Sequence, residues 1–189
     1  MGHPLRYMSE SGQAGSAASR KLIEAKESPG GEKGRPLLER LQRGLQADPS
    51  LMPFGSTVGF SVELLREGGA VVVLRTDERH ENIVGYTHGG VLSTIADTAI
   101  GLAHLTTLQE DETATTVEIK INYLRPVWHT ELRAHAHMVK RGKLLSFLEC
   151  ELLDGEDRLV ARASGTMMTV PKDKTAGRGQ FRFKEPDAE

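Results

Sequence analysis

Cysteine is almost absent from this chain of 189 residues, and its one example is Cys150. A single thiol excludes a disulfide within the chain and a zinc site built from cysteines, and it fits a reducing compartment. Apolar runs long enough to cross a bilayer are missing, as is the apolar N-terminal segment of a secretory signal. These absences predict a cytoplasmic protein that does not span a membrane.

An excess of positive charge is also missing. The 24 Lys and Arg residues stand against 26 Asp and Glu residues, which gives a net charge of −2. This balance argues against a nucleic-acid-binding protein that relies on overall positive charge. Hydrophobic residues make up 38% of the chain, which suffices for one core at this length. We therefore expect a single domain with extensions.

The two ends of the chain show no sustained apolar period. Residues 1–35 are rich in Ser, Gly, Ala and charge, which predicts a disordered N-terminal extension, and residues 171–189 are expected to form a flexible C-terminal tail. The domain between them, residues 36–170, begins with a short amphipathic helix. Its leucines fall on one stripe: Leu37, Leu38, Leu41 and Leu45.

Apolar residues with a period of two predict six strands, at residues 57–66, 70–76, 115–124, 131–140, 144–153 and 159–170. Turns rich in Gly and charged residues separate several of them. The third strand has the clearest pattern, in which Val117, Ile119, Ile121 and Tyr123 alternate with Thr116, Glu118, Lys120 and Asn122. This alternation predicts a half-buried strand.

The segment 80–105, between the second and third strands, organises the rest of the chain. A polar, Gly-punctuated approach leads into a helix whose apolar residues lie on nearly every side, which predicts a buried helix. In the last strand, Ala161, Ala163 and Gly165 share one face and leave room for this helix to approach closely. Two strands, one long helix and four more strands predict an α+β fold, in which an antiparallel sheet wraps around the helix.

Asp97 lies in the middle of this helix. An ionised carboxylate buried there is costly unless it is paired or hydrogen-bonded, so packing alone does not explain its presence. Ser93 and Thr94 on the same helix offer local hydrogen bonds, which is the usual environment of a polar residue in mid-helix. Asp97 is therefore either a structural acceptor or a catalytic carboxylate.

Three spaced motifs connect this chain to a known family. They are Asn82-x-x-Gly85-x-x-His88-Gly89-Gly90 with Asp97 nine residues after His88, then Thr116-Val117-Glu118, then Tyr123-Leu124-Arg125-Pro126-Val127. In this order they resemble the hotdog-fold acyl-CoA thioesterases of the PaaI type, in the 4-hydroxybenzoyl-CoA thioesterase superfamily. The resemblance covers roughly residues 50 to 170 and implies a hotdog fold.

The resemblance implies hydrolysis of an acyl-CoA thioester to a free carboxylic acid and coenzyme A, in a site shared by two protomers of a dimer or a dimer of dimers. It implies no metal and no other cofactor. By position, Asp97 would be the nucleophile or the general base for water, and Asn82 would orient the thioester or that water. The backbone N–H of Gly89 would stabilise the oxyanion at the helix start. His88 would shape that turn, with a catalytic role left open, and Thr116 would hydrogen-bond near the carboxylate.

Two further groups of residues are candidates for ligand binding. Four basic side chains, in one turn and at the end of the third strand, are expected to bind the phosphates of coenzyme A or else to be merely solvated: Lys140, Arg141, Lys143 and Arg125. His135 and His137 face the same side of a strand, but no third ligand with suitable spacing accompanies them. We therefore do not expect a metal site there.

Two other functions stand beside thioester hydrolysis. A dehydratase or hydratase on the same fold typically has a different pattern of Asp and His on the helix, and no such pattern stands out here. A non-catalytic hotdog domain would bind acyl-CoA as a sensor or scaffold. Thiol release separates an enzyme from a binder, because an enzyme turns over whereas a binder gives at most one equivalent per site.

Overall fold

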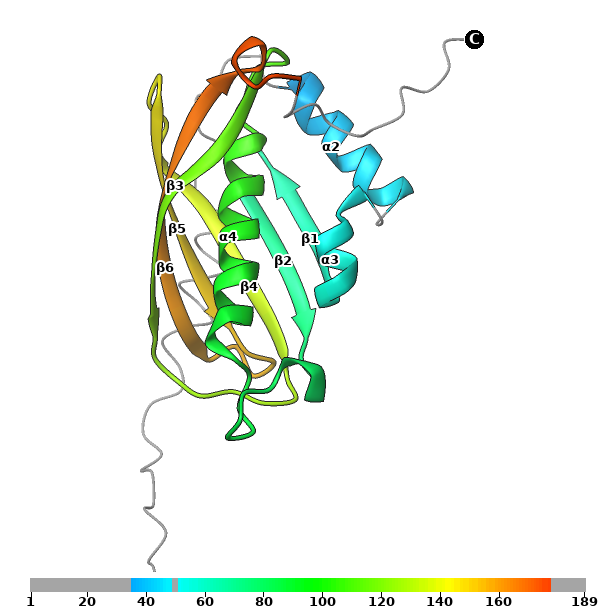
Figure 1. The fold of residues 1–189 in the computed structure, drawn as a ribbon, viewed down its shortest axis with the longest axis vertical. Helices are drawn as coiled ribbons and strands as arrows, with labels where there is room; N and C mark the ends of the chain where they lie inside the picture. The colour runs from blue at the N-terminus through cyan, green and yellow to red at the C-terminus, as the bar shows by residue number, and fades with distance from the viewer. Residues whose placement is uncertain (1–34, 49–50, 178–189) are drawn as a thin grey trace, which may run out of the picture.

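The computed structural model describes residues 35–48 and 51–177. The predicted N-terminal extension therefore lies outside the described residues except at Arg35, and so does the predicted tail beyond Gly177. Within the described ranges the chain forms a six-stranded antiparallel sheet and three α-helices (Figure 1). None of these helices combines the length and the apolar character that crossing a membrane requires.

The α-helices are α2 (Arg35–Ala47), α3 (Pro53–Val58) and α4 (Gly89–Leu105), and two short 3₁₀ helices are η3 (Glu78–His80) and η4 (Lys172–Lys174). The strands are β1 (Phe60–Arg66), β2 (Gly69–Arg75), β3 (Glu112–Tyr123), β4 (Glu131–Lys140), β5 (Leu145–Leu153) and β6 (Leu159–Pro171). Their order across the sheet is β1-β2-β4-β5-β6-β3, and each neighbouring pair is antiparallel. Strands β1 and β3 are therefore the two edges.

Helix α4 lies along one face of the sheet and contacts every strand of it (Figure 1). The residues on its sheet-facing side are fully buried: Ile95, Ala96, Ala99 and Ile100. Gly165 of β6 leaves the space that Ile100 fills, because a Cβ added at Gly165 would lie 3.2 Å from an Ile100 methyl carbon. The close approach expected from the small residues of β6 is thus confirmed. An antiparallel sheet wrapped around one long helix is the predicted hotdog fold.

The prediction that α4 is buried on nearly every side is wrong for the side turned away from the sheet. Ser93, Thr94, Asp97 and Thr98 are only half-buried in the single chain. These polar residues recur at spacings of three and four and so collect on one side of the helix, while the apolar residues pack on the sheet. Asp97 is therefore partly accessible to solvent.

Helices α2 and α3 lie beside β1, at the edge of the sheet opposite β3 (Figure 1). Leu37 and Leu41 of α2 are buried, as the predicted leucine stripe requires. Gln42 of α2 donates its Nε2–H to the carbonyl oxygen of Leu65 in β1, at 2.8 Å. Helix α2 thus occupies part of the β1 edge.

Helix α3 departs from the prediction, which began the first strand at residue 57 because Thr57 and Val58 have strand-favouring side chains. Instead, Pro53 opens a short helix, and Gly59 ends it with a φ of 93°, a left-handed conformation that glycine adopts readily. Strand β1 therefore begins at Phe60. The ends of the other predicted strands are correct to within three residues, and β4 matches at both ends.

Strand β3 carries a bulge at Val117, where its register with β6 shifts between Thr116 and Glu118. In a regular strand Thr116 and Ile119 would point to opposite faces, as the alternating pattern predicts. The extra residue instead turns Thr116 to the face of Ile119, toward α4, and leaves Val117 exposed. The bulge is what brings Thr116 to Asp97.

Candidate active site

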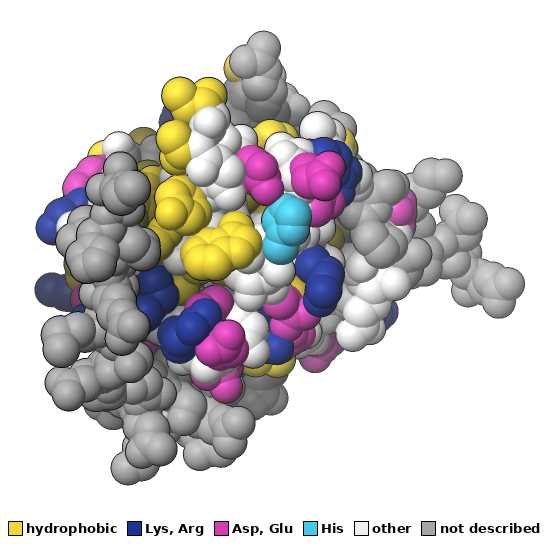
Figure 2. Space-filling view, turned by 90° about the horizontal axis from the view of Figure 1, so that it is seen from below, with side chains coloured by type: hydrophobic (Ala, Val, Ile, Leu, Met, Phe, Trp, Pro, Cys, Tyr) yellow, Lys and Arg dark blue, Asp and Glu magenta, His cyan; other side chains and the backbone are white. Residues whose placement is uncertain are grey.

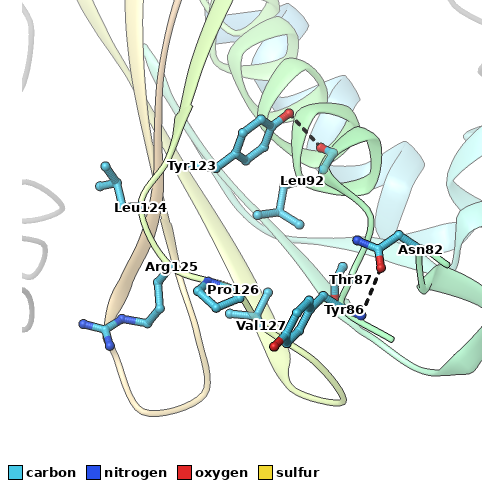
Figure 3. A pocket seen from close by; sticks show the side chains of 10 residues that line it. Asn82, Tyr86, Thr87, Leu92, Tyr123, Leu124, Arg125, Pro126 and Val127 are labelled. Atoms are coloured by element: carbon cyan, nitrogen blue, oxygen red, sulfur yellow. Dashed lines mark hydrogen bonds between the residues drawn. The ribbon is translucent and has the colours of Figure 1, made fainter. Parts of the chain in front are cut away.

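Asn82 closes the loop that leads into α4. Its Oδ1 accepts hydrogen bonds from the backbone N–H groups of Val84 (2.9 Å) and Tyr86 (3.2 Å), and its own backbone N–H donates to the carbonyl oxygen of Tyr86 (2.8 Å). Gly85 takes a φ of 80° in this turn, which favours glycine. Because Oδ1 is engaged within the loop (Figure 3), the Nδ2 amide is the part of the side chain left to donate to a ligand.

His88 is the N-cap residue of α4, and its Nδ1 accepts a hydrogen bond from the Gly90 N–H at 2.9 Å. This contact agrees with the structural role considered for His88. Among the hydrogen bonds of the described residues, none is donated by the Gly89 N–H. The first N–H groups of a helix have no acceptor within the helix and attract negative charge. Gly89 therefore offers a donor at the position expected for an oxyanion site.

Tyr123, at the end of β3, reaches the same helix start. Its hydroxyl donates to the carbonyl oxygen of Gly89 at 3.0 Å and lies 2.7 Å from Oγ of Ser93. Figure 3 shows the ring pointing from the strand toward the first turn of α4. The end of β3 and the start of α4 are thus joined by side-chain hydrogen bonds.

A pocket of about 380 Å³ opens between this helix start, the Asn82 loop and the segment that follows β3 (Figure 3). Its lining residues are Asn82, Tyr86, Thr87, Gly89, Leu92, Tyr123, Leu124, Arg125, Pro126 and Val127. Its lining mixes apolar side chains with polar ones, and the pocket is open to solvent on one side. Three predicted site residues meet here, namely Asn82, Gly89 and Arg125.

Exposed apolar side chains gather at the end of the molecule that carries this pocket (Figure 2). The exposed large apolar residues of the Asn82 loop and of the segment that follows β3 are Ile83, Val84, Tyr86, Leu124 and Trp128. The rings of Tyr86 and Trp128 lie against each other, with their centroids 5.7 Å apart. An apolar surface of this kind is typical of a region that meets a ligand or another subunit.

Asp97 does not line this pocket. It follows Gly89 by eight residues, which places it about 12 Å farther along the helix axis. Thr116 Oγ1 donates to its Oδ1 at 3.0 Å, as the family resemblance implied. Among the hydrogen bonds of the described residues, Asp97 accepts none from Ser93 or Thr94, and Ser93 pairs with Tyr123 instead. The carboxylate is therefore held from β3 and not from its own helix.

A single chain does not bring the four basic candidates together. Arg125 borders the pocket, whereas the turn of Lys140, Arg141 and Lys143 joins β4 to β5 at the opposite end of the sheet. Arg141 is also engaged within the chain, since it donates to Thr169 Oγ1 at 3.0 Å and pairs with a Glu112 carboxylate oxygen at 3.4 Å. Within one protomer, only Arg125 of these four adjoins the pocket.

The described residues contain no group of three or more His, Cys, Asp or Glu side chains that could hold a metal ion. The pKa values of His135 and His137 are lowered, chiefly because burial disfavours the charged imidazolium. Burial likewise raises the pKa of the Cys150 thiol, so this residue stays a neutral core side chain. None of the three joins the pocket.

An antiparallel sheet wrapped around one long helix is the hotdog fold, and here a backbone donor at the helix start lies beside a pocket. Residues 84–161 match the family model of the Thioesterase superfamily. A Pseudomonas aeruginosa protein, PA0474, is 37% identical over 99 residues, which cover 50% of this chain and 71% of that protein. The chain belongs to the thioesterase superfamily.

Two further comparisons support this assignment. The 1,4-dihydroxy-2-naphthoyl-CoA hydrolase of Listeria monocytogenes is 27% identical over 123 residues, which cover 65% of this chain and all of that enzyme. Among solved structures, a mutant of the phenylacetic acid degradation protein PaaI from Thermus thermophilus is similar at 29% identity and a TM-score of 0.57, covering 61% of this chain and 97% of that one. The resemblance to PaaI-type proteins is thus confirmed.

Sequence reasoning did not predict the contact of Tyr123 with Ser93 and Gly89. The sequence shows Tyr123 as a member of a strand pattern and of the third family motif, and Ser93 only as a neighbour of Asp97. The contact depends on how the end of β3 meets the start of α4, and these two segments are 34 residues apart in the chain. The pairing of a strand-end tyrosine with a Gly-Gly helix start is a signal that could have found it.

Proposed function

We propose that the protein hydrolyses an acyl-CoA thioester to a free carboxylic acid and coenzyme A. The observation that carries the proposal is the Gly89 N–H, which begins a 17-residue helix, borders the pocket and donates to no acceptor among the described residues. The carbonyl oxygen of a thioester gains negative charge when it is attacked, and a preorganised N–H stabilises that charge. The coenzyme A thioester in the name of the Listeria hydrolase supports the same substrate class.

Asn82 supplies the second donor in this proposal. Its Nδ2 group remains available beside Gly89, because its Oδ1 is bound to the loop. Two donors on one carbonyl oxygen polarise the thioester more strongly than one. The same amide group would alternatively orient the attacking water.

Asp97 supplies the carboxylate that hydrolysis requires. As a nucleophile it would displace the coenzyme A thiolate and form a mixed anhydride, which water then cleaves. As a general base it would take a proton from the water that attacks the carbonyl carbon and would give that proton to the departing thiolate. In both routes Thr116 holds the carboxylate through the hydrogen bond at 3.0 Å.

A second protomer brings the carboxylate to the oxyanion donor in this proposal. Asp97 lies about 12 Å along α4 from Gly89 of its own chain, which is too far for both to touch one carbonyl group. Antiparallel pairing of two β3 edges across a two-fold axis would reverse the second sheet end to end. Such a pairing would bring the partner subunit's Thr116 toward the Tyr123 end of this strand, and with it the partner subunit's Asp97 toward the pocket.

The test is release of coenzyme A thiol from a panel of aryl, short-chain and long-chain acyl-CoA thioesters. We expect many turnovers per site on at least one member of the panel. Release of one equivalent or less per site, on every member, would contradict hydrolysis and favour a non-catalytic acyl-CoA-binding domain.

A further inference from the structure

The hydroxyl of Tyr123 takes part in two hydrogen bonds at the start of α4. It has one proton, which it donates to the Gly89 carbonyl oxygen at 3.0 Å, so the Ser93 hydroxyl, 2.7 Å away, donates to Tyr123. Gly89 and Ser93 are four residues apart and so lie on one side of the first turn. The chain Ser93 to Tyr123 to Gly89 therefore connects β3 to the turn that carries the proposed oxyanion donor.

These contacts restrain one particular peptide group. The carbonyl of Gly89 and the N–H of Gly90 belong to the same planar peptide unit. Tyr123 holds its oxygen, and Nδ1 of His88 accepts its N–H at 2.9 Å. Two successive glycines have the widest backbone freedom of any residues, so this helix start needs such restraints from side chains. Holding this peptide unit limits the directions that the preceding N–H, that of Gly89, can take.

Close approach of Tyr123 also explains why position 89 lacks a side chain. A Cβ added to Gly89 would lie 3.1 Å from Cζ of Tyr123 and 3.3 Å from its hydroxyl oxygen. Both distances are tighter than ordinary contacts between carbon or oxygen atoms. Gly89 therefore makes room for the phenol that in turn holds its carbonyl group.

Tyr123 is 52% exposed, so packing in the core does not explain its presence at this position. A hydrogen bond in such a position contributes little to stability, and a purely structural tether would do no more than that. We propose that Tyr123 is a positioning residue for thioester hydrolysis: it fixes the peptide that follows the Gly89 N–H, so that this N–H points at the carbonyl oxygen of the substrate. The inference rests on the proposed function.

The experiment compares Tyr123→Phe, which keeps the ring and removes the hydroxyl, with wild type on the best acyl-CoA substrate. Loss of a whole oxyanion donor costs about 10²- to 10³-fold in kcat, so a donor that is present but less well oriented should cost about 10-fold. KM should change by less than about twofold, since the ring and the pocket walls remain. Ser61→Ala removes an exposed hydroxyl from β1, at the other edge of the sheet, and serves as the control.

A second measurement tests whether Tyr123 acts through Gly89. In Gly89→Ala the added methyl group already displaces the phenol, so Tyr123→Phe should lower kcat much less in that background than it does in wild type. Additive losses in the double variant would overturn the inference, as would a normal kcat for Tyr123→Phe beside an active wild type. An inactive wild type would instead overturn the proposed function, so the two failures are distinguishable.

Discussion

At the scale of single residues, Asn82 combines two roles in one side chain. Its oxygen closes the loop by accepting from Val84 and Tyr86, and its nitrogen is the part that can face the substrate. Replacement by alanine would remove both roles together and could not separate them. Replacement by aspartate keeps an oxygen for the loop and removes only the donor.

We therefore predict that Asn82→Asp retains the fold and melts close to wild type, whereas its kcat falls by ~10² or more, because a donor is lost and a negative charge faces the developing oxyanion. Circular dichroism and steady-state kinetics measure the two effects. Asn82→Ala should lose both stability and rate. A fully active Asn82→Asp would show that the Asn82 side chain stabilises the loop but does not contribute to catalysis.

At the scale of secondary-structure elements, the far end of α4 carries a buried histidine. His104 is fully buried, and its Nε2 lies 3.3 Å from Thr169 Oγ1. Burial lowers its pKa to about 4, and the nearby positive charge of Arg141 acts in the same direction. The folded protein therefore keeps His104 neutral at pH values where an unfolded chain would protonate it.

This difference predicts a stability that depends on pH. The unfolded state binds a proton near pH 6.5 and the folded state only near pH 4, so acidification between these values favours unfolding. The free energy of unfolding should be highest above pH 6.5 and should fall by up to ~3 kcal/mol toward pH 4 from this residue. Urea titrations at fixed protein concentration measure it. His104→Gln should reduce the change of unfolding free energy with pH but not abolish it, because His135 and His137 contribute in the same direction. An unchanged pH dependence in His104→Gln would contradict the role given to His104.

The four basic residues expected to bind coenzyme A phosphates lie at two opposite ends of the sheet. Arg125 follows β3 and borders the pocket, while Arg141 lies at the opposite end and binds Thr169 and Glu112. We predict that Arg125→Gln raises KM for acyl-CoA more than it lowers kcat, because phosphates are remote from the reacting carbon. Rising salt should weaken binding of acyl-CoA to wild type but leave a short thioester without the nucleotide unaffected.

Arg141→Gln is the matched variant, since it removes the same charge from the other end of the sheet. A rise in KM for Arg141→Gln equal to that for Arg125→Gln would indicate that a partner subunit carries its basic turn to the same ligand. Equal salt sensitivity for both thioesters would remove the case for phosphate binding at either end.

The sequence predicts these elements well where one period continues without interruption, as in β4, whose ends it gives correctly. It fails where a local event breaks the period. The bulge at Val117 turns Thr116 to the face of α4, and Gly59 ends a helix whose last two residues, Thr57 and Val58, favour strands. The motif nevertheless predicted two residues of one pocket, Asn82 and Gly89. Both lie in the short segment of loop and helix start that the motif covers, so their distance depends little on the rest of the fold. Within one chain Arg125 and the turn of Lys140, Arg141 and Lys143 lie at opposite ends of β4, so their binding to one ligand stays a prediction.

At the scale of the whole molecule, the two edges of the sheet are unequal. Helices α2 and α3 lie beside β1, and Gln42 occupies a β1 carbonyl group. Strand β3 has a neighbour only on its β6 side among the described strands, and Val117 and Tyr123 are exposed along it. An unpaired edge of this length is a ready surface for a second strand. We therefore predict that the active unit is at least a dimer paired through β3, and light scattering that finds a fully active monomer at assay concentration would refute this.

A dimer in which one chain supplies the Gly89 donor and the other supplies Asp97 makes a stringent prediction. Asp97→Asn keeps the shape and loses the charge, so it should fold and dimerise with kcat lower by ~10² or more. Gly89→Ala should be impaired in both binding and rate, because its methyl group meets Tyr123. In a heterodimer of the two variants, one site combines both lesions and the other combines neither.

Heterodimers purified through two different tags should therefore recover about half of the wild-type activity per dimer, since a two-fold dimer has two equivalent sites. Thiol release from the best acyl-CoA of the panel measures this, with each homodimeric variant as its own baseline. If each site were built from one chain, both sites of the heterodimer would carry one lesion and no recovery would occur. Near-normal turnover by Asp97→Asn itself would show that Asp97 is not catalytic. Its hydrogen bond with Thr116 would then serve only to link α4 to β3.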